Sequence, residues 1–384
     1  MGGALNGTPA TRARRLLVVA GEPSGDAHAA RVVRRLQALG PVEVHAVAGP
    51  ELRAAGATMI VPQEELAVIG FSGVIAKLPV ILRARRAILD DVARFQPDAA
   101  LLVDYPGFNL RLGPELKRLG VKVFYYIAPQ VWAWHAERAA QMAAWVDRLA
   151  VVFPFEERIF RDAGVAAHFV GHPLLDDLAP ELDEATFRAE LGVPAEARLV
   201  GLLPGSRAGE MRAHARTLLE VGQRLRARFP DVVPVLALAR NLTTEGLPAH
   251  LFEGVKVVKG RTHSVQAHAA CCAVASGTAT LETALLGSPL AIVYRVGWIN
   301  HAIARRVVKL SHIGLPNIVA GREVAPEFIQ GEFRADALAD TLGGWLADPA
   351  ALAQRREALR EVRTRLGGGG ASERTAQLLA EVLA

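Results

Sequence analysis

The stretch that decides the fold is LLVVAGEPSGD, residues 16–26. Its first five residues form a short apolar run, and a turn that contains two glycines follows at once. Residues 27–39 then have the pattern of a helix, which Gly40 and Pro41 end. A strand, a glycine-containing turn and a helix in this order are typical of the start of a doubly wound parallel α/β sheet.

The alternation of strands and helices continues along the chain. Glycine, proline and aspartate cluster over residues 171–180, which indicates a domain boundary. The pattern then starts again, so we predict two α/β units with a cleft between them, since open parallel sheets bind ligands beyond the carboxyl ends of their strands. The further predicted strands are 42–48, 98–104, 121–127, 149–153, 199–203, 232–238, 255–258, 270–275 and 290–294. The further predicted helices are 80–95, 110–119, 208–228, 278–287, 299–309, 334–347 and 350–365.

Four consecutive glycines, residues 367–370, predict a flexible joint before a last helix over 371–383. The joint could let this helix return to the first domain, or exchange between the subunits of a homodimer. We therefore expect a first doubly wound domain over 1–172, a second over 173–366, and a terminal segment over 367–384 that packs back on the first domain.

The composition is that of a globular protein with sizeable cores, since 51% of the 384 residues are hydrophobic. Basic residues exceed acidic ones by 44 to 39, a mild excess that would help docking to phosphates or to an anionic membrane. The chain has neither a signal-peptide pattern nor an apolar run of the ~18 residues that a spanning helix needs, so any membrane contact is expected to be peripheral. We expect Cys271 and Cys272 to be buried thiols in a reducing cytoplasm, and no metal site, because His135 has no second ligand at metal spacing.

Two turns of the second half, 204–207 and 276–279, follow predicted strands and are rich in small residues. Small residues let an anion approach the backbone, an arginine offers a planar fork for phosphate, and the start of a helix attracts negative charge. An ordinary turn or simple helix capping would have the same composition. Two such turns in one half favour a nucleotide site, and Glu282, one helical turn further on, could accept hydrogen bonds from a ribose diol. The candidate residues of the two turns are Gly205, Ser206, Arg207, Ser276, Gly277, Thr278 and Ala279.

Carboxylates follow two predicted strands of the first half. Asp104 ends the strand over 98–104, at the position where a side chain would face a ligand cleft. It could act as a general base toward a sugar hydroxyl, or it could cap the turn. Asp26, next to Ser24 and Gly25, could bind acceptor hydroxyls, but we favour a cap for the helix over 27–39.

Two stretches, 66–89 and 283–322, contain basic residues without any acidic ones. Apolar side chains among unopposed cations suit an interfacial segment on anionic lipid, and the alternative is a core helix with a solvated basic face. Gly70 and Gly73 make a core helix awkward, so for 66–82 we favour the membrane interpretation. The candidate residues are Val68, Ile69, Phe71, Ile75, Lys77 and Arg83 in the first stretch, and Arg305 and Arg306 in the second.

In their order along the chain, the motifs resemble those of the lipid-A-disaccharide synthase family. The resemblance runs from residue 16 to about residue 325; the second-half turns are shared with other glycosyltransferases, whereas the first-half motifs are specific to this family. The matching motifs are GEPSGD (21–26), AGP (48–50), ELAVIG (65–70), DYPGFN (104–109), PQVWAW (129–134), FPFE (153–156), FVGHP (169–173), LPGSR (203–207), ASGTATLE (275–282) and LPN (315–317).

The resemblance implies a GT-B fold, in which two Rossmann-like domains face each other across a cleft. It implies transfer of 2,3-diacylglucosamine from UDP-2,3-diacylglucosamine to 2,3-diacylglucosamine 1-phosphate, with inversion to a β(1→6) link and release of UDP. The first domain would face the acceptor and the membrane, and the second would bind the UDP-sugar. It also implies an enzyme without a required metal or other cofactor, peripherally bound to anionic lipid on the cytoplasmic face of the inner membrane of a Gram-negative bacterium.

Site residues follow from the resemblance by position. Asp104 matches the candidate general base, Arg207 the donor-phosphate arginine, and Asn317 a further residue implicated in activity. Residues 276–279 match the UDP-binding loop and Glu282 the ribose contact of GT-B enzymes.

The sequence departs from the family pattern at two positions. Pro23 stands where other members carry threonine, and Gly107 stands where some members carry aspartate. The turn that follows residues 98–103 therefore keeps a single carboxylate, which strengthens the assignment of Asp104 as the base.

Other classes of protein share part of these features. Another GT-B enzyme, such as a transferase to a polyprenyl-linked sugar or a UDP-sugar epimerase, would share the second-half turns. A peripheral lipid- or nucleotide-binding module would bind UDP-sugars without turnover. Neither a P-loop NTPase nor a nucleic-acid binder is favoured, because the sequence lacks the motifs of both.

Overall fold

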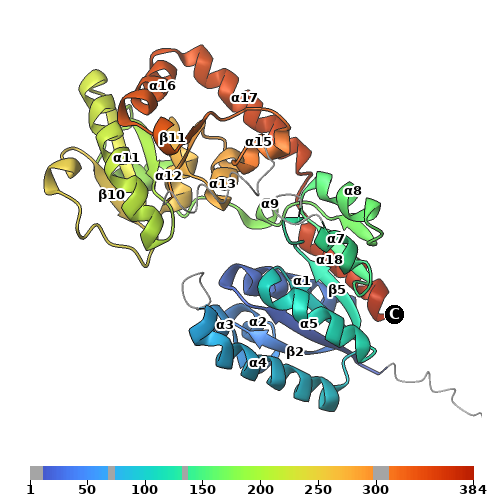
Figure 1. Cartoon of the computed structure of the whole chain (residues 1–384). Helices are drawn as coiled ribbons and strands as arrows, with labels where there is room; N and C mark the ends of the chain where they lie inside the picture. Colours follow the sequence, from blue (N-terminus) through green and yellow to red (C-terminus); the bar gives the residue numbers. More distant parts are fainter. Residues whose placement is uncertain (1–11, 68–73, 132–136, 297–310) are drawn as a thin grey trace, which may run out of the picture. The chain divides into compact units, whose positions relative to one another are not determined.

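The chain folds into two compact α/β units, each built on one parallel sheet (Figure 1). The first unit comprises Met1–Pro173 together with Gly370–Ala384, and the second comprises Leu174–Gly369. The predicted fold class, two Rossmann-like doubly wound units, is confirmed. The computed structural model describes residues 12–67, 74–131, 137–296 and 311–384.

The first unit contains seven parallel strands in the order β3-β2-β1-β4-β5-β6-β7. Since β1 pairs with β2 on one side and β4 on the other, the strand order reverses between β1 and β4. Residues 16–20 of β1 and all of β4 are apolar and buried, as parallel strands in the middle of a doubly wound sheet must be. The strands are β1 (Arg14–Ala20), β2 (Val42–Ala48), β3 (Thr58–Pro62), β4 (Ala99–Val103), β5 (Lys122–Tyr126), β6 (Arg148–Val151) and β7 (Ala167–Phe169).

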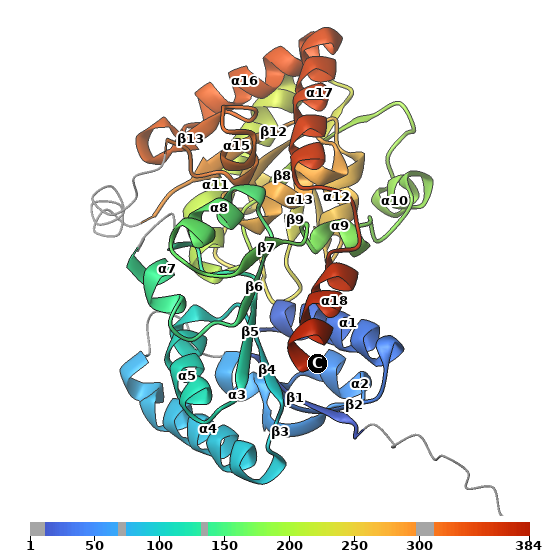
Figure 2. The same ribbon diagram turned by 90° about the vertical axis from the view of Figure 1, so that its right-hand side faces the viewer.

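Helices cover both faces of the first sheet (Figure 1). The apolar sides of α4 and α5 pack on one face, and α18 lies beside α1 on the other (Figure 2). The terminal helix α18 is fastened at both ends: Lys122 Nζ donates to the Val382 carbonyl at 2.7 Å, and Arg374 Nε donates to the Val170 carbonyl at 2.8 Å. The helices are α1 (Pro23–Leu39), α2 (Pro50–Ala54), α3 (Gln63–Ala67), α4 (Val74–Phe95), α5 (Pro106–Arg118), α7 (Glu137–Met142), α8 (Pro154–Asp162) and α18 (Ala371–Leu383).

The second unit contains six strands in the order β10-β9-β8-β11-β12-β13, which reverses between β8 and β11. Cys271 and Cys272 lie in β11 as buried free thiols, as predicted. The strands are β8 (Arg198–Leu203), β9 (Val232–Leu238), β10 (Lys256–Lys259), β11 (Cys271–Ala275), β12 (Leu290–Tyr294) and β13 (Glu327–Ile329). The helices are α9 (Leu174–Asp177), α10 (Glu184–Leu191), α11 (Ala208–Arg228), η1 (Ala249–Phe252), α12 (Thr262–His268), α13 (Thr278–Leu286), α15 (Leu315–Ala320), η2 (Gln330–Glu332), α16 (Ala335–Ala347) and α17 (Pro349–Arg365).

Every predicted strand is present, with ends that differ by at most two residues. Three helices of the first unit start earlier than predicted. In α1 and α5 the extra turn begins with Pro23 or Pro106, because proline fits the first helical position, where its missing N–H costs nothing. In α4 the helix continues through Pro79 back to Val74, which corrects the predicted start at residue 80. The predicted helix over 299–309 lies entirely outside the described residues.

Candidate functional site

In each unit, two turns with candidate site residues follow the two strands where the strand order reverses, at the carboxyl ends of these strands. In the first unit the turns after β1 and β4 carry Glu22 and Asp104. In the second unit the turns after β8 and β11 carry Arg207 and Ser276. Open α/β sheets bind ligands at this switch point, so each unit presents one candidate site there.

Asp104 stands in a backbone conformation that ordinary residues avoid. Its φ is +45° and that of Tyr105 is +51°, both in the left-handed region. Three hydrogen bonds hold this turn: Asp104 N donates to the Tyr126 carbonyl at 2.9 Å, and the Asp104 carbonyl accepts from Asn109 Nδ2 at 2.8 Å and from Tyr125 Oη at 2.7 Å. Such strain costs roughly 1–3 kcal/mol per residue and persists only where the surroundings impose it, which happens most often at functional sites.

The Asp104 carboxyl is partly buried and lies in a negative environment. Burial, together with the negative charge of Glu22, raises its pKa to about 6, against a smaller opposing effect of a hydrogen bond from the Tyr105 backbone. Glu22 itself is exposed. A carboxyl group with this pKa is mostly ionised at pH 7 yet basic enough to accept a proton, which is what general base catalysis requires.

The structure gives Asp26 a role other than the predicted cap of a helix over 27–39. Asp26 lies inside α1, which begins at Pro23, and its side chain is only 1% exposed. Its carboxylate caps the next helix, α2, instead, so the predicted cap is wrong. The donors to this carboxylate are Gly49 N at 2.8 Å, Glu51 N at 2.8 Å and Leu52 N at 3.3 Å.

The neighbours of Asp26 differ in their exposure. Ser24 is exposed in the first turn of α1. Gly25 is buried, and a Cβ there would lie 3.6 Å from the Ala20 side chain, so the helix packs closely on β1. Of the three residues predicted for acceptor binding in this loop, only Ser24 therefore offers a solvent-facing side chain.

Glu210, which the sequence analysis did not single out, fills the turn after β8. Its Oε2 accepts from Ser206 N at 2.9 Å and Arg207 N at 3.2 Å, and its Oε1 lies 3.2 Å from Arg207 Nη1. Gly205 has a φ of +109°, and a Cβ there would lie 2.3 Å from Glu210 Oε2. Two amides predicted to face a phosphate thus already hold a carboxylate, while the Arg207 side chain is 84% exposed and open to an anion.

His214 ties the same turn to the end of β12. The ring is fully buried in α11, with Nδ1 2.8 Å from the Pro204 carbonyl and Nε2 3.0 Å from Arg295 N. A neutral ring with its proton on Nδ1 satisfies both partners. Burial lowers the pKa of His214, which favours this neutral form.

The turn after β11 leaves backbone donors available. Ser276 Oγ donates to the Ile313 carbonyl at 3.3 Å, and Gly277, with a φ of +150°, precedes α13. In the described part of the chain, the amides of Gly277, Thr278 and Ala279 have no recorded acceptor. Three free N–H groups at the start of a helix form the arrangement predicted to bind a diphosphate.

Asn317, predicted to be a catalytic residue, is fully buried and fully hydrogen-bonded. Its Oδ1 accepts from Val324 N and Ala325 N, and its Nδ2 donates to the Ala325 carbonyl and to Glu327 Oε1 at 2.8 Å. Glu327 in turn accepts from Ile313 N at 3.0 Å, whose carbonyl receives Ser276 Oγ. Asn317 therefore supports the turn beside the diphosphate loop and has no side-chain atom left for a substrate.

The two basic, apolar stretches, 66–89 and 283–322, are described in part. Val68, Ile69, Phe71, Arg305 and Arg306 lie outside the described residues, and Ile75 and Lys77 fall in the first two turns of the α4 backbone. Further along α4, Leu78 and Leu82 are 47% and 49% exposed, and Arg83 is exposed next to them. Among the described helices, none is long and apolar enough to cross a membrane.

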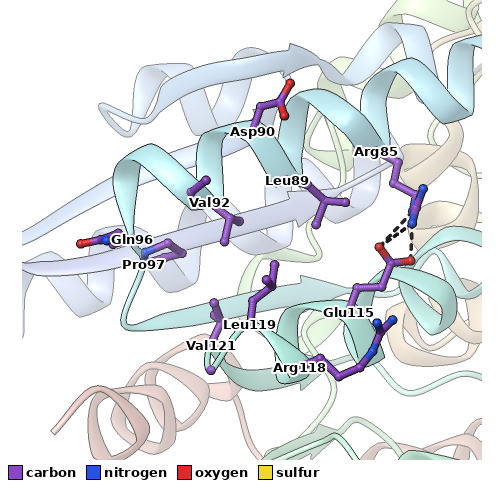
Figure 3. Close-up of a pocket in the computed structure, with 12 residues that line it drawn as sticks. Arg85, Leu89, Asp90, Val92, Gln96, Pro97, Glu115, Arg118, Leu119 and Val121 are labelled. Carbon is purple, nitrogen blue, oxygen red and sulfur yellow. Dashed lines mark hydrogen bonds and ion pairs between the residues drawn. The ribbon is translucent and has the colours of Figure 1, made fainter.

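The absence of acidic residues from 66–89 suggested that its cations are unopposed. The structure shows acidic partners for two of them. Arg85 Nη2 donates to Glu115 Oε2 at 2.7 Å, and Arg86 Nε lies 3.9 Å from Asp90 Oδ2. The Arg85 pair lines a groove of about 580 Å³ between α4 and α5 (Figure 3). This groove also contacts Pro97, which precedes β4, so it lies at the amino ends of the strands, away from Asp104.

No group of histidine, cysteine, aspartate and glutamate side chains within the described ranges could hold a metal ion. The groups that the two candidate sites offer to a ligand are the Asp104 carboxyl, the Arg207 guanidinium and the backbone amides of 277–279. Among the residues that support the site and were not predicted, Glu210 could have been found from the sequence. It lies three residues after Arg207, at the spacing of a capping box. Glu327, which supports the turn after β11 through Ile313 N, had no such signal.

Comparison with known proteins identifies the family. Residues 16–382 match the family described as lipid-A-disaccharide synthetase. The lipid-A-disaccharide synthase of Geobacter metallireducens is 41% identical over 374 residues, which covers 96% of this chain and 97% of that protein. The lipid-A-disaccharide synthase of Anaeromyxobacter sp. strain K is 42% identical over 368 residues, with 94% and 96% covered.

Solved structures share the fold at low sequence identity. A UDP-GlcNAc 2-epimerase from Neisseria meningitidis bound to UDP-GlcNAc superposes with a TM-score of 0.62 at 12% identity and covers 96% of this chain and 100% of that one. The glycotransferase of kitacinnamycin superposes with a TM-score of 0.63 at 17% identity, with 97% and 100% covered. These similarities establish the fold of the chain and nothing more about its reaction.

Proposed function

Because this chain belongs to the lipid-A-disaccharide synthase family, and is thus a glycosyltransferase of lipid A biosynthesis, we propose the following reaction for it. It transfers 2,3-diacylglucosamine from UDP-2,3-diacylglucosamine to 2,3-diacylglucosamine 1-phosphate. The anomeric carbon inverts, a β(1→6) link forms, and UDP is released.

The donor is proposed to bind at the switch point of the second unit. The free amides of Gly277, Thr278 and Ala279 would hold the diphosphate, and the exposed Arg207 guanidinium would lie alongside. Glu282 would accept hydrogen bonds from the ribose diol. These groups stabilise the negative charge that grows on the leaving UDP, since preorganised donors act most strongly where charge develops in the transition state.

Asp104 is proposed as the general base of the first unit. Its carboxylate takes the proton from the 6-hydroxyl of the acceptor as the oxygen attacks the anomeric carbon. The observation that carries this assignment is the strained turn of Asp104 and Tyr105 at the carboxyl end of β4, together with a pKa raised to about 6. Strain and a perturbed pKa at the switch point of a sheet are typical of a functional residue.

The acceptor and donor carry acyl chains, so the enzyme is proposed to work on a lipid surface. The exposed leucines and Arg83 of α4, with the basic residues predicted around it, would hold the chain peripherally on anionic lipid at the cytoplasmic face of the inner membrane. A homodimer, with α18 exchanged between subunits, is the assembly that the glycine joint would permit.

A radiolabelled transfer assay tests the reaction. The two diacylated substrates are incubated with the wild-type chain and with Asp104→Ala, and the disaccharide 1-phosphate is quantified. We expect product from the wild type, and a loss of roughly 10²–10⁴ in turnover for the variant with UDP affinity nearly unchanged. Normal turnover by Asp104→Ala would remove it as the base. Formation of a 2-epimer from UDP-N-acetylglucosamine alone would instead indicate an epimerase.

A further inference from the structure

His263, in the first turn of α12, lies between two carboxylates that are far apart in the sequence. Its Nε2 is 3.6 Å from Glu282 Oε2 on α13, and its Nδ1 is 3.8 Å from Glu181 Oε1 in the segment before α10. The Ala179 carbonyl is a further acceptor for the ring. Both ring nitrogens thus face acceptors, and only the doubly protonated imidazolium can satisfy both sides.

Glu181 is a fixed anchor for this ring. Its carboxylate accepts from Ser264 N at 2.7 Å, from Ser264 Oγ at 2.8 Å and from His263 N at 3.1 Å. Burial raises the pKa of Glu181, but these hydrogen bonds outweigh it and lower the pKa overall. Glu181 is therefore ionised at neutral pH and holds the start of α12 in place.

Glu282 is less constrained than Glu181. In the parts of the chain that the structure describes, the Glu282 carboxylate forms its ion pair with His263. The Glu282 side chain is 20% exposed, so one oxygen can face a ligand while the other faces the ring. The direction in which this carboxylate points is consequently set by His263.

We propose that His263 is a positioning residue for donor binding: its imidazolium, anchored by Glu181, orients the Glu282 carboxylate to receive the ribose diol of a nucleoside diphosphate. This inference deepens the proposed function and rests on the donor site assigned there. It adds two residues behind Glu282, His263 and Glu181, and neither belongs to a motif that the sequence analysis identified.

The arrangement makes donor binding depend on pH. The contact with Glu282 and the charges of Glu282 and Glu181 raise the pKa of His263, against an opposing effect of burial. Arg261, a cation two residues before His263, is itself paired with Glu190 of α10 at 3.2 Å. The imidazolium is present below its raised pKa, so the orientation of Glu282 is lost as pH rises through that value.

Calorimetric titration with UDP from pH 5.5 to 8.5 tests the proposal. The ratio of the dissociation constants of His263→Ala and wild type cancels the ionisation of UDP itself. We expect a ratio of roughly 2–5 at pH 6, the size of a partly exposed ion pair, which falls toward 1 at high pH. His263→Arg should bind UDP more tightly than His263→Ala. Because arginine stays charged throughout this pH range, the affinity of this variant should not change with the ionisation of residue 263. His250→Ala, an exposed histidine of the same unit, is the matched control and should give a ratio near 1 throughout.

The outcomes separate this inference from the donor site itself. Turnover at saturating donor should stay within about twofold for His263→Ala, since an interaction that serves binding alone changes KM and not kcat. If Glu282→Ala weakens UDP binding while His263→Ala leaves both the affinity and its pH dependence as in the wild type, the positioning role is refuted and the donor site stands. If UDP does not bind the wild type, or Glu282→Ala has no effect, the donor assignment fails and takes this inference with it.

Discussion

The buried charge of Asp104 lowers the free energy of unfolding, and this effect can be measured without substrate. Its pKa is about 6 in the folded state, against an ordinary value of 3.8. Between these values the folded protein holds a proton that the unfolded chain has released, so the free energy of unfolding falls as pH rises. Above pH 6 the full cost, roughly 3 kcal/mol, is present.

Asp104→Asn should therefore stabilise the protein at pH 8. Asparagine has no charge to bury and tolerates the left-handed backbone. In urea unfolding we expect a gain of up to about 3 kcal/mol at pH 8. Most of this gain disappears near pH 4, where the folded carboxyl is protonated and the unfolded one is close to its own pKa of 3.8. Asp90→Asn, at an exposed position of α4, should change stability by less than about 0.5 kcal/mol. Equal stability of Asp104→Asn and wild type at pH 8 would contradict the buried charge.

The positions of residues were predictable from the sequence only where they follow from a place along a strand. Asp104 was placed correctly because a residue directly after a buried strand must lie at the carboxyl edge of the sheet. Asp26 was assigned to the wrong helix because its carboxylate reaches residues 49–52, on another element. The contact of Glu210 with turn 204–207 competes with the predicted anion site, and the small residues of that turn did not reveal it.

At the scale of elements, the long buried strands were predictable, and three of the four edge strands were not. β3, β7 and β13 were missed, and all three lie at the edge of a sheet. An edge strand is short and only partly buried, so it lacks the continuous apolar run that marks β1 or β4. The early start of α4 was missed because Pro79 reads as a helix breaker, although the structure continues the helix through it.

Asn317 holds α15 and β13 together, so its removal should act on stability first. Asn317→Ala would leave Val324 N and Ala325 N without their acceptor and would remove one of the donors to Glu327. Unpaired buried groups cost roughly 1–3 kcal/mol each, and partial relaxation makes a total loss of about 2–4 kcal/mol the expected result. Thermal unfolding should show a lowered Tm, with activity lost in parallel. Asn241→Ala, at an exposed position of the same unit, is the control. An inactive Asn317→Ala with the wild-type Tm would instead place this side chain in the chemistry.

At the scale of the whole molecule, fold class and family were both predictable, for different reasons. The fold class followed from alternating strands and helices, a pattern that many unrelated enzymes share. The family followed from the order of turn motifs in both halves, and the match over residues 16–382 confirms it. The support behind those turns was not predictable, because it consists of side-chain contacts between separate elements. His214 joins the Pro204 carbonyl to Arg295 N, and His263 lies between Glu282 and Glu181.

Attachment of the whole molecule to lipid should depend on the exposed apolar side of α4. Leu78 and Leu82 are four residues apart and half exposed, so they lie on one side of the helix, with Arg83 beside them. Replacing both leucines with serine removes apolar carbons, each of which contributes ~0.8 kcal/mol when it is inserted into the lipid. Because each side chain is only partly inserted, we expect a loss of roughly 1 kcal/mol of binding free energy per substitution. Together the two substitutions should lower the affinity for vesicles about 30-fold. Cosedimentation with vesicles that contain anionic phospholipid measures it. Leu39→Ser, at an equally exposed leucine that ends α1, is the matched control and should bind as the wild type does. Vesicle binding that survives the double substitution unchanged would assign attachment to another surface. A loss in the double variant alone, with UDP affinity retained, would assign lipid attachment to this helix.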